Sequence, residues 1–190
     1  MKHFAFCLAL LTVLAPSAFA LEPMPTCGPD KLTTLDEPAV KEERDPFELV
    51  NSEAIDGWLK LGIPAAVVMN QFALRPVKGD YEFWGAYVAY VQSWHYSHLG
   101  LTIDMISEQI GGEQAVLSVS LAGPNSTFTT ARGIKVGSTW AEVEAAYGEE
   151  REYGTAGGEH IFVAGSIYGG LIFTFEDDRV TEIFLGAGAE

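Results

Sequence analysis

The sequence predicts an α+β protein made of two tandem units that together form one extended antiparallel sheet with helices on one face. Three observations support this fold class. The second half of the chain repeats the first faintly and in register, each half begins with an apolar pattern of helical spacing, and each half ends in segments where apolar and polar side chains alternate. The pairs Gly100-Leu101 and Gly170-Leu171 open equivalent strands in the two halves. Because an internal repeat governs the whole architecture, each unit is predicted to be a helix followed by a three-stranded meander.

The helices of the two units are expected to start by two different devices at the same position of the repeat. In the first unit the helix starts at Pro64, where the first-turn amide needs no partner, and it ends before Pro76. In the second unit Thr139 and Glu142 have the spacing of a capping box. Gly148 stands where a residue in the left-handed conformation would close that helix.

The predicted strands follow each helix. They are expected at 87–96, 99–106 and 115–121 in the first unit, and at 160–165, 168–176 and 179–185 in the second. Gly111-Gly112 and Asp177-Asp178 supply turns between successive strands. A further short helix is predicted ahead of the first unit's helix, starting at Pro46 and running through Leu59.

The amino-terminal residues predict export. Residues 1–20 are predicted to be a signal peptide, because Lys2 precedes a short apolar run and Ala18-Phe19-Ala20 matches a cleavage signal. That run is too short to cross a membrane and no later segment is long enough, so no membrane span is expected. Residues 21–45 are predicted to be a flexible leader, 46–125 the first repeat unit and 126–190 the second. The mature protein is therefore expected in the periplasm or secreted, after cleavage following Ala20.

The cysteine content limits how the fold can be stabilised, and the net charge limits which partners the protein can bind. Cys27 is the only cysteine left after the predicted cleavage, so the fold depends on packing and not on an internal disulfide. Its place after Met24-Pro25-Thr26 matches a lipid-anchor signal poorly. The formal net charge of −15 would repel phosphate backbones and anionic lipids, so nucleic acid and membrane surfaces are not expected partners.

The sequence predicts no enzyme, no cofactor and no metal site. His95 and His98 are three residues apart, which places them on opposite faces of a strand. Ser166 lies in a predicted hairpin and lacks the spacing of a nucleophile elbow. The glycine pairs have the positions of turns and not of a phosphate-binding loop.

Alternation along the strands separates a buried face of the predicted sheet from an open face. The residues expected to pack beneath the helices are Leu99, Leu101, Ile103, Met105, Leu117, Val119, Leu121, Leu171, Phe173, Phe175, Ile183 and Leu185. Aromatic and large apolar side chains on the opposite face would favour protein binding, because one rigid ring buries much area at low entropic cost. The predicted partner-binding residues on the open face are Tyr90, Trp94, Tyr96, Ile172 and Phe184.

The second unit also resembles a known module of bacterial envelope proteins. Gly137, Thr139, Val143, Tyr147 and Gly148 follow a short Gly-x-Thr pattern that resembles the SmpA/OmlA (BamE) lipoproteins and the β-lactamase inhibitor protein family. Two tandem copies are more similar to the inhibitor family, in which two units join edge to edge and a concave sheet grips a partner protein. The chain departs from that family in lacking cysteine pairs, and from BamE in lacking a lipid-anchor cysteine at the proper place.

These observations favour an exported, non-enzymatic binding protein that holds a protein or peptide partner on the open face of its sheet, with inhibition of that partner as one form of this role. Two alternatives stay open at the level of sequence. One is a structural envelope component of the BamE type that assists outer-membrane assembly. The other is a small-ligand carrier or enzyme with a pocket between helices and sheet, which would need convergent polar groups that the sequence does not display.

Overall fold

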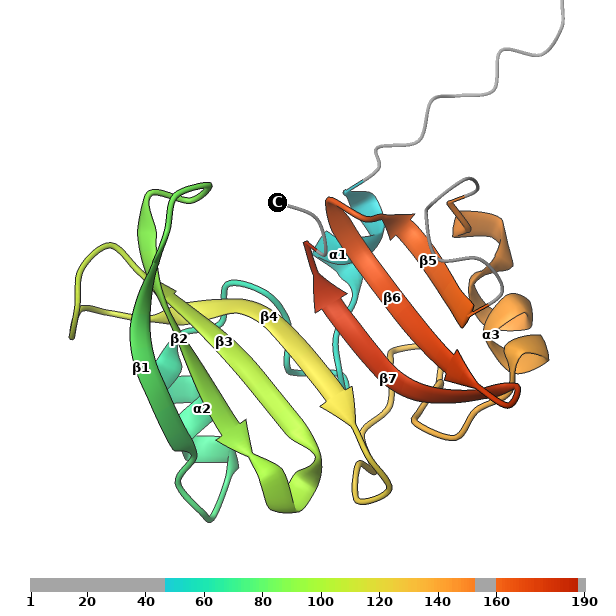
Figure 1. Ribbon diagram of the computed structural model, residues 1–190, viewed down its shortest axis with the longest axis horizontal. Helices are drawn as coiled ribbons and strands as arrows, with labels where there is room; N and C mark the ends of the chain where they lie inside the picture. The colour runs from blue at the N-terminus through green and yellow to red at the C-terminus, as the bar shows by residue number, and fades with distance from the viewer. Residues whose placement is uncertain (1–46, 153–159, 188–190) are drawn as a thin grey trace, which may run out of the picture. The chain divides into compact units, whose positions relative to one another are not determined.

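A computed structural model of the protein describes residues 47–152 and 160–187. These residues form a seven-stranded antiparallel sheet with the strand order β1-β2-β3-β4-β7-β6-β5 (Figure 1). The strands are β1 Val77–Trp84, β2 Ala89–Tyr96, β3 Leu101–Ser107, β4 Ala115–Ala122, β5 Ile161–Ser166, β6 Gly169–Glu176 and β7 Arg179–Gly186. The α-helices are α1 Glu48–Ser52, α2 Ala65–Gln71 and α3 Trp140–Tyr147, and short 3₁₀ turns cover Ser97–Leu99 and Gly148–Glu150. The predicted signal peptide, the leader and Cys27 lie outside the described residues.

Six strands occur where the alternation of the sequence predicts them, with ends that differ by one or two residues. Strand β1 was not predicted from the sequence. This strand pairs only with β2 and lies at the edge of the sheet. Its side chains are half-buried or exposed throughout, its interior contains Gly79, and its pairing shifts between Lys78 and Tyr81. Charged side chains and a bulge protect an edge strand against pairing with other chains. Because neither face of such a strand is fully buried, its sequence shows no apolar alternation.

The two halves of the sheet meet where β4 pairs with β7. Val119 lies opposite Leu185, and Leu121 lies opposite Ile183. These pairs join the two halves, so the sheet is continuous from β1 to β5. The first residues of β4 also bind the segment before α2, because the amide of Gly62 donates to the carbonyl of Val116 at 2.8 Å.

The core lies on one face of the sheet, which we call the core face. Its buried cluster includes Leu101, Ile103, Met105, Val116, Val119, Leu121, Leu171, Phe173, Ile183 and Leu185, together with Val68 of α2 and Val143 of α3. Leu117 was expected here, but it is half-buried and Val116 takes its place. The reason is a bulge between Asp104 and Met105, after which Met105 lies opposite Val116, so the register slips by one residue and exchanges the faces.

The start of α3 confirms the predicted capping box, whereas its end does not follow the prediction. The Thr139 hydroxyl accepts from the amide of Glu142 at 3.2 Å, and the Glu142 carboxylate accepts from the amide of Thr139 at 2.7 Å. Gly148 was expected in the left-handed conformation, but its φ is −61° and the chain continues into a 3₁₀ turn. Arg132 provides the missing termination, because its guanidinium donates to the carbonyl of Ala146 at 2.6 Å.

Helix α1 is shorter than the predicted helix and packs against β5 and β6. The glycines of this hairpin make room for it: a Cβ at Gly169 would lie 2.8 Å from Cδ1 of Phe47. Behind α1, the buried carboxylate of Glu53 accepts from the amide of Ala131 at 2.7 Å and from the hydroxyl of Tyr147 at 3.0 Å. Burial raises the pKa of the Tyr147 hydroxyl, which therefore stays a neutral donor to this carboxylate.

Candidate functional site

Two of the predicted partner-binding residues lie in the core. Trp94 and Tyr96 are each only 1% exposed, so the expectation that they lie on an open face was wrong. Trp94 lies opposite Ile103 and Tyr96 lies opposite Leu101, which fixes both rings on the core face. The indole nitrogen of Trp94 donates to Oε1 of Gln92 at 3.1 Å, whereas the buried hydroxyl of Tyr96 has no hydrogen-bond partner among the described residues.

Tyr90 shares the strand side of these two rings, as the alternation predicts, but its surroundings differ. It is half-buried near the end of β2, where it lies opposite Phe83 of β1 and Ser107 of β3. The rings of Tyr90 and Phe83 are 5.4 Å apart in an edge-to-face arrangement. Tyr90 thus belongs to the β1–β2 hairpin end and not to the middle of the sheet.

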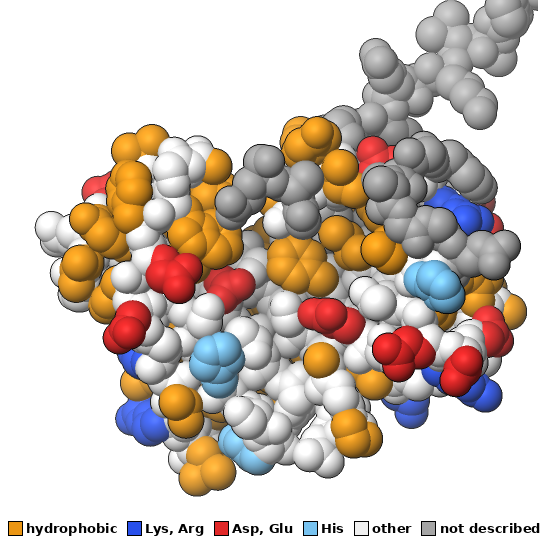
Figure 2. Space-filling model, viewed as in Figure 1, with side chains coloured by type: hydrophobic (Ala, Val, Ile, Leu, Met, Phe, Trp, Pro, Cys, Tyr) orange, Lys and Arg blue, Asp and Glu red, His pale blue; other side chains and the backbone are white. Residues whose placement is uncertain are grey.

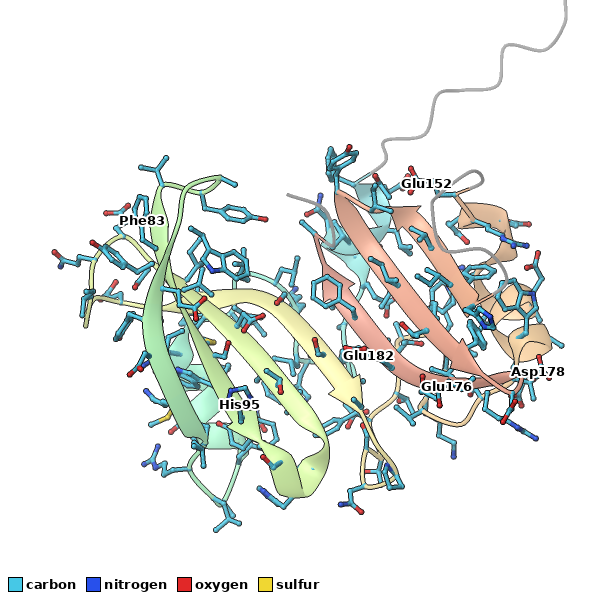
Figure 3. The ribbon with its side chains drawn as sticks, viewed as in Figure 1. Phe83, His95, Glu152, Glu176, Asp178 and Glu182 are labelled. Carbon is cyan, nitrogen blue, oxygen red and sulfur yellow. The ribbon has the colours of Figure 1, made fainter. Side chains whose placement is uncertain are left out.

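Ile172 and Phe184 lie on the face opposite the core face, which we call the second face. They are half-buried and sit directly opposite each other on β6 and β7. Next to Phe184, a row of polar side chains crosses the second face from β4 to β2. It consists of Ser120 on β4, Thr102 on β3 and His95 on β2, each opposite the next. His95 and Glu182 of β7 are labelled on this face in Figure 3.

The polar part of the second face is hydrogen-bonded within itself. The Asp104 carboxylate accepts from the Ser93 hydroxyl at 2.6 Å and from the Ser118 hydroxyl at 2.7 Å. His95 Nδ1 lies 3.2 Å from the hydroxyl of Thr102. Within 47–152 and 160–187, no three metal-ligating side chains are grouped to hold an ion. Both serine hydroxyls donate to the same carboxylate, so these polar groups of the second face satisfy one another.

An exposed apolar surface lies at the end of the β1–β2 hairpin. Hydrophobic side chains gather there in Figure 2, and Phe83 is labelled in Figure 3. Phe83 is 57% exposed, Tyr87 38% and Val88 75%. Trp84 is half-buried, with its ring 6.3 Å from that of Tyr87. We call Phe83, Trp84, Tyr87, Val88 and Tyr90 the hairpin patch.

Val88 has a backbone conformation that is unusual for its residue type. Its φ is +51°, in the left-handed region, where a β-branched side chain is strained. The turn is closed by hydrogen bonds from the amide of Tyr87 to the carbonyl of Trp84 at 3.2 Å and from the amide of Val88 to the carbonyl of Gly85 at 3.3 Å. Glycine or asparagine would fit this position without the strain. A strained residue whose side chain is mostly in water gains little from packing, so the valine is not explained by stability.

Apart from Tyr90, the residues of the hairpin patch were not predicted from the sequence, although a signal was present. Turn segments between strands are ordinarily polar or rich in glycine, asparagine and proline. The stretch from Phe83 to Val88 is instead apolar at every position except Gly85. An apolar turn between two strands is the feature that could have identified this surface.

A groove with a volume of about 1090 Å³ adjoins the hairpin patch. Three segments line it: the end of the β1–β2 hairpin through Tyr87 and Ala89, the β3–β4 connection through 106–109 and 112–115, and the start of α2 through 64–66. Tyr87 belongs to both the patch and the groove, so the two form one surface. The groove also carries the carboxylates of Glu108 and Glu113, and neither lysine nor arginine lines it.

Comparisons of the chain with protein-family models, with curated proteins and with solved structures gave no match. Among the described helices, none is long and apolar enough to cross a membrane.

Proposed function

We propose that the chain is an exported, non-enzymatic binding protein that holds a protein or peptide partner with the hairpin patch. The observation that carries this proposal is the strained and exposed Val88 within a turn of aromatic side chains. Strained backbone is concentrated at binding and catalytic sites, where function and not stability selects the residue. Aromatic side chains that converge on one exposed turn are typical of the residues that dominate binding energy at protein interfaces.

The half-buried pair Ile172 and Phe184 is proposed as a second, weaker contact region. These residues lie on the second face, next to the polar residues that continue across β4, β3 and β2. A partner that reached from the hairpin patch over this face would meet apolar side chains at β6 and β7 and hydrogen-bonding groups between them. Trp94 and Tyr96 have no part in this proposal, because the core encloses them.

The fold is further proposed to be a tandem duplication, with the units joined through β4 and β7. The strand order supports this proposal, because β2-β3-β4, with β1 added at its edge, and β5-β6-β7 are two antiparallel meanders on either side of the junction. Each meander follows a helix, α2 or α3, that contributes a fully buried valine to the core. Such an arrangement is what the resemblance to the inhibitor protein family implies, and a partner-gripping role would agree with it.

The proposal is tested by capture of partners with patch variants. Tagged protein, expressed in the organism it comes from, is compared with the double variant Phe83→Ser/Tyr87→Ser and with the control Tyr168→Ser. Tyr168 is 62% exposed in the turn between β5 and β6, so the control removes a large apolar side chain of similar exposure away from the hairpin patch and the groove. We expect one protein to be captured saturably by the wild type and the control and to be lost with the double variant. Capture that is unaffected by the double variant would overturn the proposal.

A further inference from the structure

The groove beside the hairpin patch has apolar walls of a particular kind. Ala89, Ile106 and Ala115 supply small or aliphatic surface from three neighbouring strands, and Tyr87 supplies an aromatic ring at one side. Lysine and arginine side chains bury their methylene stems against such surface and keep the charged head at a polar rim. Walls of this chemistry therefore suit the stem of a long cationic side chain.

The polar rim of the groove presents unpaired negative charge. Glu108 and Glu113 are both exposed on the connection between β3 and β4. Across the described residues, neither carboxylate forms an ion pair or accepts a hydrogen bond. Two other polar side chains of the groove have partners: the Ser107 hydroxyl donates to the carbonyl of Gln109 at 3.0 Å, and the Gln114 amide donates to Gln92 at 3.3 Å. The two glutamates are the negatively charged acceptors that an incoming cation would meet.

The surroundings of the groove and the net charge of the chain indicate a macromolecular source for that cation. A volume of about 1090 Å³ is larger than one side chain fills and comparable to the upper end of ligand sites, roughly 300–1,000 Å³. Tyr87 connects the groove to the exposed rings of the hairpin patch, so an occupant of the groove would also touch an apolar surface. The net charge of −15 would steer a basic partner toward the protein and repel an acidic one.

We infer that the groove receives a lysine or arginine side chain from a loop of a basic protein partner, whose flanking residues contact the hairpin patch. This inference rests on the proposed function and specifies the chemistry of its partner. In the complex the cation lies between Glu108 and Glu113, and the stem packs against Ala89, Ile106 and Ala115. The charge pairs fix the register of the loop, and the aromatic contacts supply most of the affinity.

The test uses peptides of defined charge and the full chain with isotope-labelled backbone amides. Hexa-arginine peptide is titrated at physiological salt, with hexa-glutamate and hexa-serine peptides as controls and spermidine as a cation that is not a peptide. The double variant Glu108→Gln/Glu113→Gln is compared with the matched variant Glu176→Gln/Asp178→Asn. This control removes the same charge from the turn between β6 and β7, which lies on the far side of the strand order from the hairpin patch (Figure 3).

We expect the arginine peptide to shift amide signals of 64–66, 87–89 and 106–115, and the groove variant to weaken its binding at least about tenfold. The control variant should change the affinity less than about twofold. Shifts spread evenly over the acidic surface, equal losses with the two variants, or spermidine binding to the same amides as tightly as the peptide would each overturn the inference. A failure here is separate from a failure of the proposed function: if capture depends on Phe83 and Tyr87 but not on Glu108 and Glu113, only the cationic partner is refuted.

Discussion

Replacement of Val88 by glycine is expected to stabilise the protein. A residue other than glycine in the left-handed region costs roughly 1–2 kcal/mol, and a β-branched side chain lies at the upper end. Glycine removes that cost but loses about 0.5–1 kcal/mol through the greater freedom of the unfolded chain. The Val88 side chain is 75% exposed, so little buried apolar surface is lost. The expected net effect is a gain of about 0.5–1 kcal/mol in the free energy of unfolding.

The assay is urea unfolding of Val88→Gly beside a matched control, Val77→Gly. Val77 has a similar exposure, 71%, but lies in strand β1 and has no positive φ. Glycine there should destabilise by about 0.5–1 kcal/mol, because it adds chain entropy without relieving strain. Equal destabilisation by the two substitutions would refute the argument that Val88 is strained. If Val88→Gly stabilises the protein and also weakens partner capture, the valine is retained for binding at a cost in stability.

Three further substitutions test the core and the local structure. Trp94→Ala should lower the free energy of unfolding, measured by urea unfolding, by about 3–5 kcal/mol, because the core encloses the ring. Trp84→Ala in the hairpin patch should lower it much less. Equal effects would contradict the placement of Trp94. Tyr147→Phe removes the donor to Glu53 and should cost about 1–3 kcal/mol. The pKa of Tyr147 is raised in the folded state, so the stabilisation by its hydroxyl is complete below the unfolded-state pKa of about 10 and is lost as the pH rises above that value. Tyr147→Phe should therefore lose stability less steeply than the wild type at alkaline pH. An unchanged slope would count against this reasoning. Thr139→Ala should cost about 0.5–2 kcal/mol through loss of the capping box, whereas the exposed loop substitution Thr127→Ala should be nearly neutral; thermal unfolding distinguishes the two.

The positions of most strands could be predicted because alternation reports a face that is buried along a whole strand. Strand β3 shows this directly, since Leu101, Ile103 and Met105 are buried and the residues between them are half-buried. The same rule fails for β1, whose edge position leaves both faces largely in water. It also fails after the β4 bulge, where a local change of register exchanges Leu117 for Val116. Bulges depend on the pairing of two strands, so a pattern within one strand does not reveal them.

The assignment of β2 to a face failed for a different reason. Its alternation separates Tyr90, Trp94 and Tyr96 correctly from the residues between them, but it does not say which side is covered. Aromatic residues with polar tips occur both in cores and at interfaces. Gln92 makes the burial of Trp94 possible, because it accepts from the indole nitrogen within the same strand and on the same side.

The most direct test of the central claim is site-specific photo-crosslinking in the native organism from position 88. The same crosslinking residue placed at Asn70, which is exposed on α2, serves as the control. If the hairpin patch holds a partner, position 88 gives one discrete crosslinked protein and position 70 does not. No crosslinked protein from position 88, or the same product from both positions, would contradict the account.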